Sequence, residues 1–153
     1  MADTSLNENR LSILVWQTSN LWQSKIRQIL KSTDLTFNEY LILETLYKLT
    51  DEQDNITQQD ICKNSSLDRS VVSQKINALE EKKLLNRSQP KDKRSYGLTL
   101  TENGILSVES LISIIENQED LIFNKLSSEI FNFTNSLKLI LGKKIRVKAK
   151  PND

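Results

Sequence analysis

The sequence predicts a mainly α-helical fold that contains one short β-hairpin. Glycine occurs 3 times and proline 2 times in 153 residues, and so few helix-breaking residues favour long helices over a β fold with many turns. Over most of the chain, apolar residues recur at steps of three and four, which is the spacing of the buried side of a helix. This period is lost around residues 84–100, where two short strands are expected.

The first predicted helix covers residues 6–31 and carries apolar residues on more than one side. Such a helix must be covered on more than one side, and a second copy of the chain is the economical cover for a protein of this size. The second helix is expected over residues 36–49, because Thr36 and Glu39 have the spacing of a capping box. In that motif each side chain accepts a hydrogen bond from the backbone N–H of the other residue.

Two further helices are predicted close together. One covers residues 57–64, where Thr57 and Asp60 repeat the capping-box spacing. After a tight turn, the other covers residues 68–82, with Asp68 or a neighbour as its N-cap. The buried face of this helix is predicted to consist of Val72, Ile76 and Leu79.

A β-hairpin follows directly, with strands expected over residues 84–88 and 96–100 and a turn-rich, basic tip over residues 89–95. Two helices joined by a tight turn and followed by a hairpin form a winged helix-turn-helix. Residues 57–100 carry a net charge of +4, although the whole chain carries only +1. The sequence therefore concentrates positive charge on the part of the chain that is shaped for a polyanion.

The remainder of the chain is predicted to be helical. Thr101 is expected to cap a helix that runs to about Lys125, and Ser127 or Ser128 to open a last helix. The predicted organisation is a single domain over residues 1–153, made of a winged helix-turn-helix lobe over 36–100 and a helical dimerisation region over 6–31 and 101–147.

The helix over residues 68–82 has the composition of a helix that reads DNA. The major groove is about 12 Å wide and admits one helix, whose polar side chains must be short enough to let it approach the bases. The predicted contacts on this helix are Arg69, Ser70, Ser73, Gln74, Lys75 and Asn77. At the hairpin tip, Arg94 is expected to enter a minor groove, with Asp92 holding its guanidinium. The predicted contacts at the tip are Lys91, Asp92, Lys93, Arg94 and Ser95.

Between Leu35 and Gly104 the chain resembles the multiple-antibiotic-resistance regulator (MarR) family of winged helix-turn-helix transcription regulators. The matching residues are, in chain order, Leu35-Thr36, Ile56 to Cys62, Leu67 to Glu80, Leu84 to Arg87, Asp92-Lys93-Arg94 and Leu98 to Gly104. The most specific part is the Asp-x-Arg of the tip followed at short range by Leu-Thr-x-x-Gly.

The resemblance implies a homodimer in which the first helix and the last two helices interlock. It implies two winged lobes that meet a pseudo-palindromic double-stranded DNA operator, with half-sites about 34 Å apart. It also implies a repressor that a small, often aromatic or phenolic, effector releases from DNA.

Two positions depart from the family pattern. Lys83 stands where the family commonly has glycine, and a left-handed backbone there would cost a non-glycine residue about 1 kcal/mol unless the turn takes another shape. Gln74 stands where the family often has arginine. Since arginine favours guanine and glutamine favours adenine, the base preference is expected to differ.

Composition excludes most catalytic chemistry. With 0 histidines and 1 cysteine, the chain has no Ser-His-Asp or Cys-His constellation, no disulfide and no thiolate metal cluster. No enzyme activity, metal or cofactor is expected. No signal peptide or membrane span is predicted, and a cytoplasmic location fits. The competing function is a winged-helix module that binds protein without DNA, which the low net charge favours.

The sequence leaves two interpretations open for each of three features. Trp16 and Trp22 belong either to the dimer core or to the wall of an effector pocket. Cys62 is either a small core residue or a redox switch. The cations between Lys143 and Lys150 either complement the C-terminus of the last helix or contact phosphates.

Overall fold

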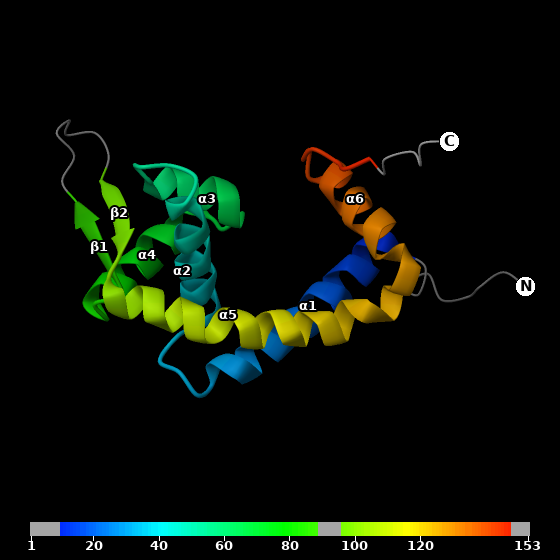
Figure 1. Cartoon of the computed structure of the whole chain (residues 1–153), viewed down its shortest axis with the longest axis horizontal. Coiled ribbons are helices and arrows are strands. Elements are labelled where there is room, and N and C mark those ends of the chain that lie inside the picture. The colour runs from blue at the N-terminus through cyan, green and yellow to red at the C-terminus, as the bar shows by residue number, and fades with distance from the viewer. Residues whose placement is uncertain (1–9, 89–95, 148–153) are drawn as a thin grey trace, which may run out of the picture. The chain divides into compact units, whose positions relative to one another are not determined.

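The computed structural model describes residues 10–88 and 96–147. Its elements, shown in Figure 1, are α1 (Leu11–Leu30), α2 (Phe37–Thr50), α3 (Gln58–Ser65), α4 (Arg69–Glu81), β1 (Leu85–Ser88), β2 (Gly97–Leu100), α5 (Glu102–Phe123), the 3-10 helix η1 (Asn124–Glu129) and α6 (Ile130–Ile140). The predicted fold class, mainly helical with one antiparallel hairpin, is confirmed. The chain divides into two compact units between Glu116 and Asn117.

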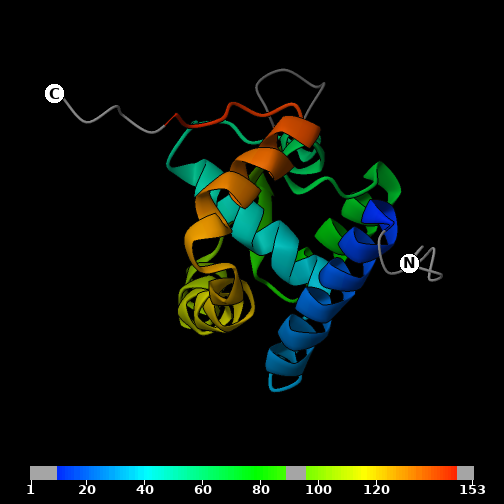
Figure 2. The same cartoon turned by 90° about the vertical axis from the view of Figure 1, so that its right-hand side faces the viewer.

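The first unit is built around α2. In Figure 1, α2, α3, α4 and the hairpin lie together, and α1 leads through residues 31–36 into α2 (Figure 2). The fully buried side chains that hold these elements together include Ile42, Leu43, Leu46, Ile61, Val72, Ile76, Leu79, Leu85 and Val108. A second cluster joins the end of α1 and the start of α2 to α5 through Ile26, Leu30, Phe37, Tyr40, Leu111 and Ile115.

Local signals in the sequence placed most element boundaries correctly. Both predicted capping boxes are formed, by Thr36 with Glu39 and by Thr57 with Asp60. Thr101 caps α5, because its Oγ1 accepts a hydrogen bond from the backbone N–H of Gly104 at 3.0 Å. The predicted strands form, with Leu85 opposite Leu100 and Ser88 opposite Gly97 in antiparallel register.

The first helix is shorter than predicted within the described residues. It begins at Leu11, because Arg10 has an extended backbone (φ −79°, ψ 113°). The remainder of the prediction, residues 6–9, lies outside the described part of the chain. Asp68 occupies the N-cap position of α4, but its side chain makes no capping hydrogen bond.

The prediction for the start of the last helix was wrong. Neither Ser127 nor Ser128 caps α6, since both lie in η1, where Ser127 adopts φ 48° and ψ −120°. The helix ends at Ile140, and Gly142 (φ 68°) then reverses the chain, so residues 143–147 are not helical. The backbone N–H of Lys143 closes this turn on the carbonyl oxygen of Lys138 at 2.8 Å.

Candidate nucleic-acid interface

The two helices of the helix-turn-helix are joined by a turn that the backbone closes tightly. Ser66 adopts the left-handed conformation (φ 59°), and its backbone N–H donates to the carbonyl oxygen of Cys62 at 3.0 Å. The backbone N–H of Leu67 donates to the Ser65 hydroxyl at 3.2 Å. With these backbone groups hydrogen-bonded, only three residues separate the end of α3 from the start of α4.

One side of α4 is buried and the opposite side is polar. Val72, Ile76 and Leu79 are fully buried, as predicted. The polar side, which we call the α4 face, consists of the exposed residues Arg69, Ser70, Gln74 and Asn77 and the half-buried Ser73. These five positions lie within about 140° of each other around the helix axis, because successive residues are about 100° apart.

Lys75, which was predicted to contact DNA with them, does not belong to the α4 face. Its ammonium lies 3.9 Å from Oε1 of Glu39, on the side of α4 that faces α2. The physical reason is the helical period, which turns the position after Gln74 toward the back of the helix. Lys75 therefore contributes to the attachment of α4 rather than to its outward side.

Glu39 has two roles, and the sequence predicted only the first, which is to cap α2. Its second role is to hold the end of α4 through Lys82. Glu39 caps α2 by accepting the backbone N–H of Thr36 at 3.1 Å, and it is only 3% exposed. Its Oε2 also lies 2.8 Å from the ammonium of Lys82, at the C-terminal end of α4. Burial by itself raises the pKa of Glu39, but the hydrogen bonds from Lys82 and Thr36 and the charges of Lys82 and Lys75 outweigh it and lower the pKa below its usual value.

The residue after the C-cap of α4 has the left-handed backbone conformation that glycine usually adopts at this position. Lys83 adopts φ 58°, and its backbone N–H donates to Glu80 while that of Leu84 donates to Leu79, both at 3.0 Å. This is a Schellman motif, and the alternative expectation of another turn shape is wrong. The Thr101 hydroxyl donates to the carbonyl oxygen of Lys83 at 2.8 Å, which ties this turn to the start of α5.

The hairpin contributes a second residue that the sequence analysis missed. Arg87, on β1, donates a hydrogen bond from Nη2 to Oδ1 of Asn77 on the α4 face. The predicted tip contacts Lys91, Asp92, Lys93, Arg94 and Ser95 lie outside the described residues and remain predictions.

A hollow of about 240 Å³ lies beside the end of α4. It is lined by Thr33, Asp34, Leu35, Lys82, Leu84, Ser107, Ser110 and Leu111, all in the first unit. Neither Trp16 nor Trp22, the predicted pocket walls, lines it. Trp22 instead packs edge-on against Phe37 with ring centres 5.3 Å apart, and Trp16 is 62% exposed.

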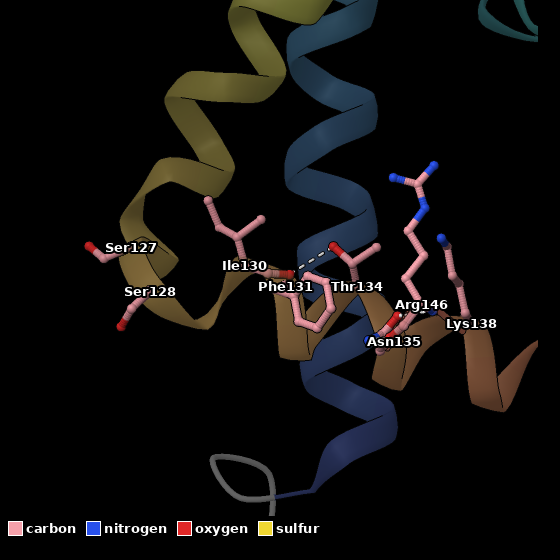
Figure 3. A pocket seen from close by; sticks show the side chains of 8 residues that line it. All are labelled: Ser127, Ser128, Ile130, Phe131, Thr134, Asn135, Lys138 and Arg146. Carbon is pink, nitrogen blue, oxygen red and sulfur yellow. Dashed lines mark hydrogen bonds between the residues drawn. The ribbon is translucent and has the colours of Figure 1, made fainter. Parts of the chain in front are cut away.

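A second hollow of about 390 Å³ lies in the second unit, beside α6 (Figure 3). Asn135 forms two hydrogen bonds with the backbone of Arg146, accepting at 3.1 Å and donating at 2.7 Å, and so fastens the segment after α6 to the helix. Lys138 and Arg146 extend to one side of this hollow, and Ser127 and Ser128 extend to the other (Figure 3).

Within residues 10–88 and 96–147, no group of three His, Cys, Asp or Glu could hold a metal ion. No helix of this part of the chain has the length and apolar character needed to cross a membrane. Cys62 is half-buried and packs against the core of the first unit.

Comparison with known proteins identifies the family. The family model of the MarR family matches residues 33–95. The chain is 31% identical over 111 residues to YdcH of Bacillus subtilis (strain 168), an uncharacterized HTH-type transcriptional regulator. The matched segment is 72% of this chain and 76% of YdcH. The chain belongs to the MarR family. As a MarR family member it is a DNA-binding transcriptional regulator rather than an enzyme.

Solved structures of MarR family members have the same architecture. The complex of Staphylococcus aureus MepR with DNA matches with a TM-score of 0.77 and 30% identity, over 89% of this chain and 97% of that chain. Bordetella bronchiseptica BpsR matches with a TM-score of 0.74 and 22% identity, over 89% of this chain and 95% of that chain. At 22% identity the likeness shows the shared fold alone.

Proposed function

We propose that this MarR family protein is a homodimeric repressor that binds a pseudo-palindromic operator and is released from it by a small aromatic or phenolic effector. In each copy the α4 face enters a major groove, and the hairpin tip with Arg94 reaches an adjacent minor groove. The observation that carries the proposal is the α4 face itself, a polar surface on a helix whose other side is locked into the core. MepR, which is 30% identical, has been crystallised as a complex with DNA.

The dimer is supported by apolar side chains that a single copy leaves uncovered. On α1 they are Leu11, Leu14, Val15, Trp16 and Leu21, with Leu11 78% exposed. In the second unit they include Leu121, Phe133, Leu137, Leu139 and Ile140. At about 25 cal/mol per Å² of apolar surface, burial of these side chains against a second copy would stabilise a dimer strongly.

The effector is supported by the hollow at the end of α4. It combines three leucines with small hydroxyl-bearing residues, which suits a small partly apolar molecule, and Lys82 connects it to α4. BpsR, which shares the fold, has DNA binding that is regulated by 6-hydroxynicotinic acid. In the proposed dimer, Trp16 and Trp22 of the second copy would form walls of such a pocket. Because its target is the chromosome, we place the protein in the cytoplasm.

The test is DNA binding by the purified protein between 50 and 200 mM salt, using duplexes from the region upstream of its own gene and scrambled controls. Sequence-preferring binding that weakens steeply with salt is expected, because phosphate contacts release counterions. Arg94→Ala should weaken binding by about 1–3 kcal/mol, and Lys91→Ala should lower the salt slope by about one.

The matched control is Lys31→Ala, which removes an exposed cation at the end of α1 and should change neither quantity. Unchanged affinity in both tip variants would contradict the tip contacts. Absence of salt-dependent binding to any duplex would instead favour the alternative, a winged-helix module that binds protein.

A further inference from the structure

The contact between Arg87 and Asn77 follows from the pleat of β1. Alternate residues of a strand share one face, so Arg87 lies on the same face as Leu85. Leu85 is fully buried in the core, whereas Arg87 is half-buried at its edge, where the hairpin meets α4. Its Nη2 there donates to Oδ1 of Asn77, an exposed residue of the α4 face.

This contact limits what Asn77 can offer to a base. A guanidinium has five N–H donors and no acceptor, so the asparagine amide must turn its oxygen toward Arg87. The amide NH₂ group is then the part left to face outward. An unconstrained asparagine recognises adenine by accepting from N6 and donating to N7 at the same time. With its oxygen already accepting from Arg87, Asn77 would have to share that oxygen between the guanidinium and adenine N6, whereas its NH₂ group is available to donate.

We propose that Arg87 is a positioning residue that turns Asn77 into a donor and directs it to guanine instead of adenine. Guanine presents two acceptors in the major groove, N7 and O6, whereas adenine presents one acceptor and one donor. The proposal rests on the function proposed above, because it requires the α4 face to lie in the major groove. It adds a determinant of base preference that lies on the hairpin rather than on the reading helix.

The experiment first selects operators from a randomised duplex library with the wild-type protein. Asn77→Ala then identifies the base pair that Asn77 reads, as the position where discrimination is lost. At that position, duplexes with guanine and with adenine are compared for the wild type and for Arg87→Ala. The wild type should prefer guanine, and Arg87→Ala should shift the ratio of affinities toward adenine by roughly five- to hundredfold, the discrimination of one bidentate contact.

Two controls separate this role from a structural one or from a phosphate contact. In an Asn77→Ala background, Arg87→Ala should leave the guanine-to-adenine ratio unchanged, because no amide remains to be positioned. Arg87→Lys, which keeps a donor at this place, should retain more of the guanine preference than Arg87→Ala. Unfolding midpoints of all variants report whether the lobe remains folded.

Three results would overturn the proposal. One is equal loss of affinity for all four bases in Arg87→Ala, which would make Arg87 a phosphate contact. Another is a wild-type preference for adenine at the position that Asn77 reads. The third is an Arg87→Ala shift that persists without the Asn77 amide. Failure of the wild type to select any duplex would instead remove the function proposed above, and this inference with it.

Discussion

Replacing Glu39 by glutamine tests the buried ion pair that fastens α4 to α2. Glu39 is 3% exposed, and its Oε2 lies 2.8 Å from the ammonium of Lys82. Glutamine has nearly the same size and retains an oxygen that can accept from Thr36 and Lys82. The substitution therefore removes a charge while leaving the packing and most of the capping geometry in place.

The expected cost is about 1–2 kcal/mol of unfolding free energy. A hydrogen bond to a charged group contributes about 1.5–3 kcal/mol, and a neutral one about 0.5–1.5 kcal/mol. Breaking a fully buried ion pair costs about 3–5 kcal/mol, because the remaining charge is stranded. The side chains of Lys82 and Lys75 are 27% and 24% exposed, so water can solvate them when the carboxylate is gone, and the smaller figure applies.

The cost should also depend on pH, with a definite sign. The folded-state pKa of Glu39 is lowered from its ordinary value of 4.5, since the bonds and charges of Lys82, Thr36 and Lys75 outweigh the effect of burial. A group of this kind contributes stability that is fully present above its unfolded pKa and is lost as the pH falls through its folded pKa. The difference between wild type and Glu39→Gln should be constant near neutral pH and should close below about pH 4.5.

Urea unfolding followed by circular dichroism measures this difference, at one fixed protein concentration because dimer formation contributes to the apparent stability. The matched control is Glu44→Gln, which disrupts the more exposed pair of Glu44 with Lys48 at 3.0 Å on the same helix. That control should cost no more than about 0.5 kcal/mol. A loss of stability in Glu39→Gln no larger than that in Glu44→Gln would contradict the role of the buried ion pair. The same would follow if Glu39→Gln lost as much stability at pH 3.5 as at pH 7.

Three further substitutions test the turn, the close packing and the dimer. Lys83→Gly should raise the unfolding free energy by about 0.5–1 kcal/mol in the same urea assay, because glycine adopts φ 58° without strain, and a loss of stability would contradict the Schellman turn. Gly104→Ala should cost at least about 1–3 kcal/mol, since its Cβ would lie 2.0 Å from the carbonyl oxygen of Leu84; Ser110→Ala, on the same helix, is the control. Trp16→Asp should shift the protein from dimer to monomer in sedimentation equilibrium, and an unchanged mass would remove α1 from the proposed interface.

Interactions between residues close in the sequence made much of this fold predictable. The capping boxes at Thr36 and Thr57 need only residues three apart, and the buried stripe of α4 needs only the helical period. The wrong start of α6 has a local cause too. Two adjacent serines look like an N-cap, but Ser127 has a non-helical backbone (φ 48°, ψ −120°) that kinks the chain, and Glu129 occupies the N-cap position of α6.

The parts of the site that were missed depend on residues far apart in the chain. The contact of Lys82 with Glu39 spans 43 residues, and no spacing rule indicates it. The contact of Arg87 with Asn77 spans 10 residues and depends on how the hairpin folds against α4. Lys75 was grouped with the α4 face by its polarity, whereas its angle around the helix already separates it from that face, and its contact with DNA stays a prediction.

The same contacts suggest how an effector could act on DNA binding. Lys82 ends α4, lines the hollow beside it, and contacts both Glu39 and the backbone carbonyl of Asp34. A ligand in this hollow that competes with Asp34 for the ammonium would alter the attachment of the reading helix directly. Such a ligand shifts the position of α4 only if it binds two arrangements of Lys82 with different affinity.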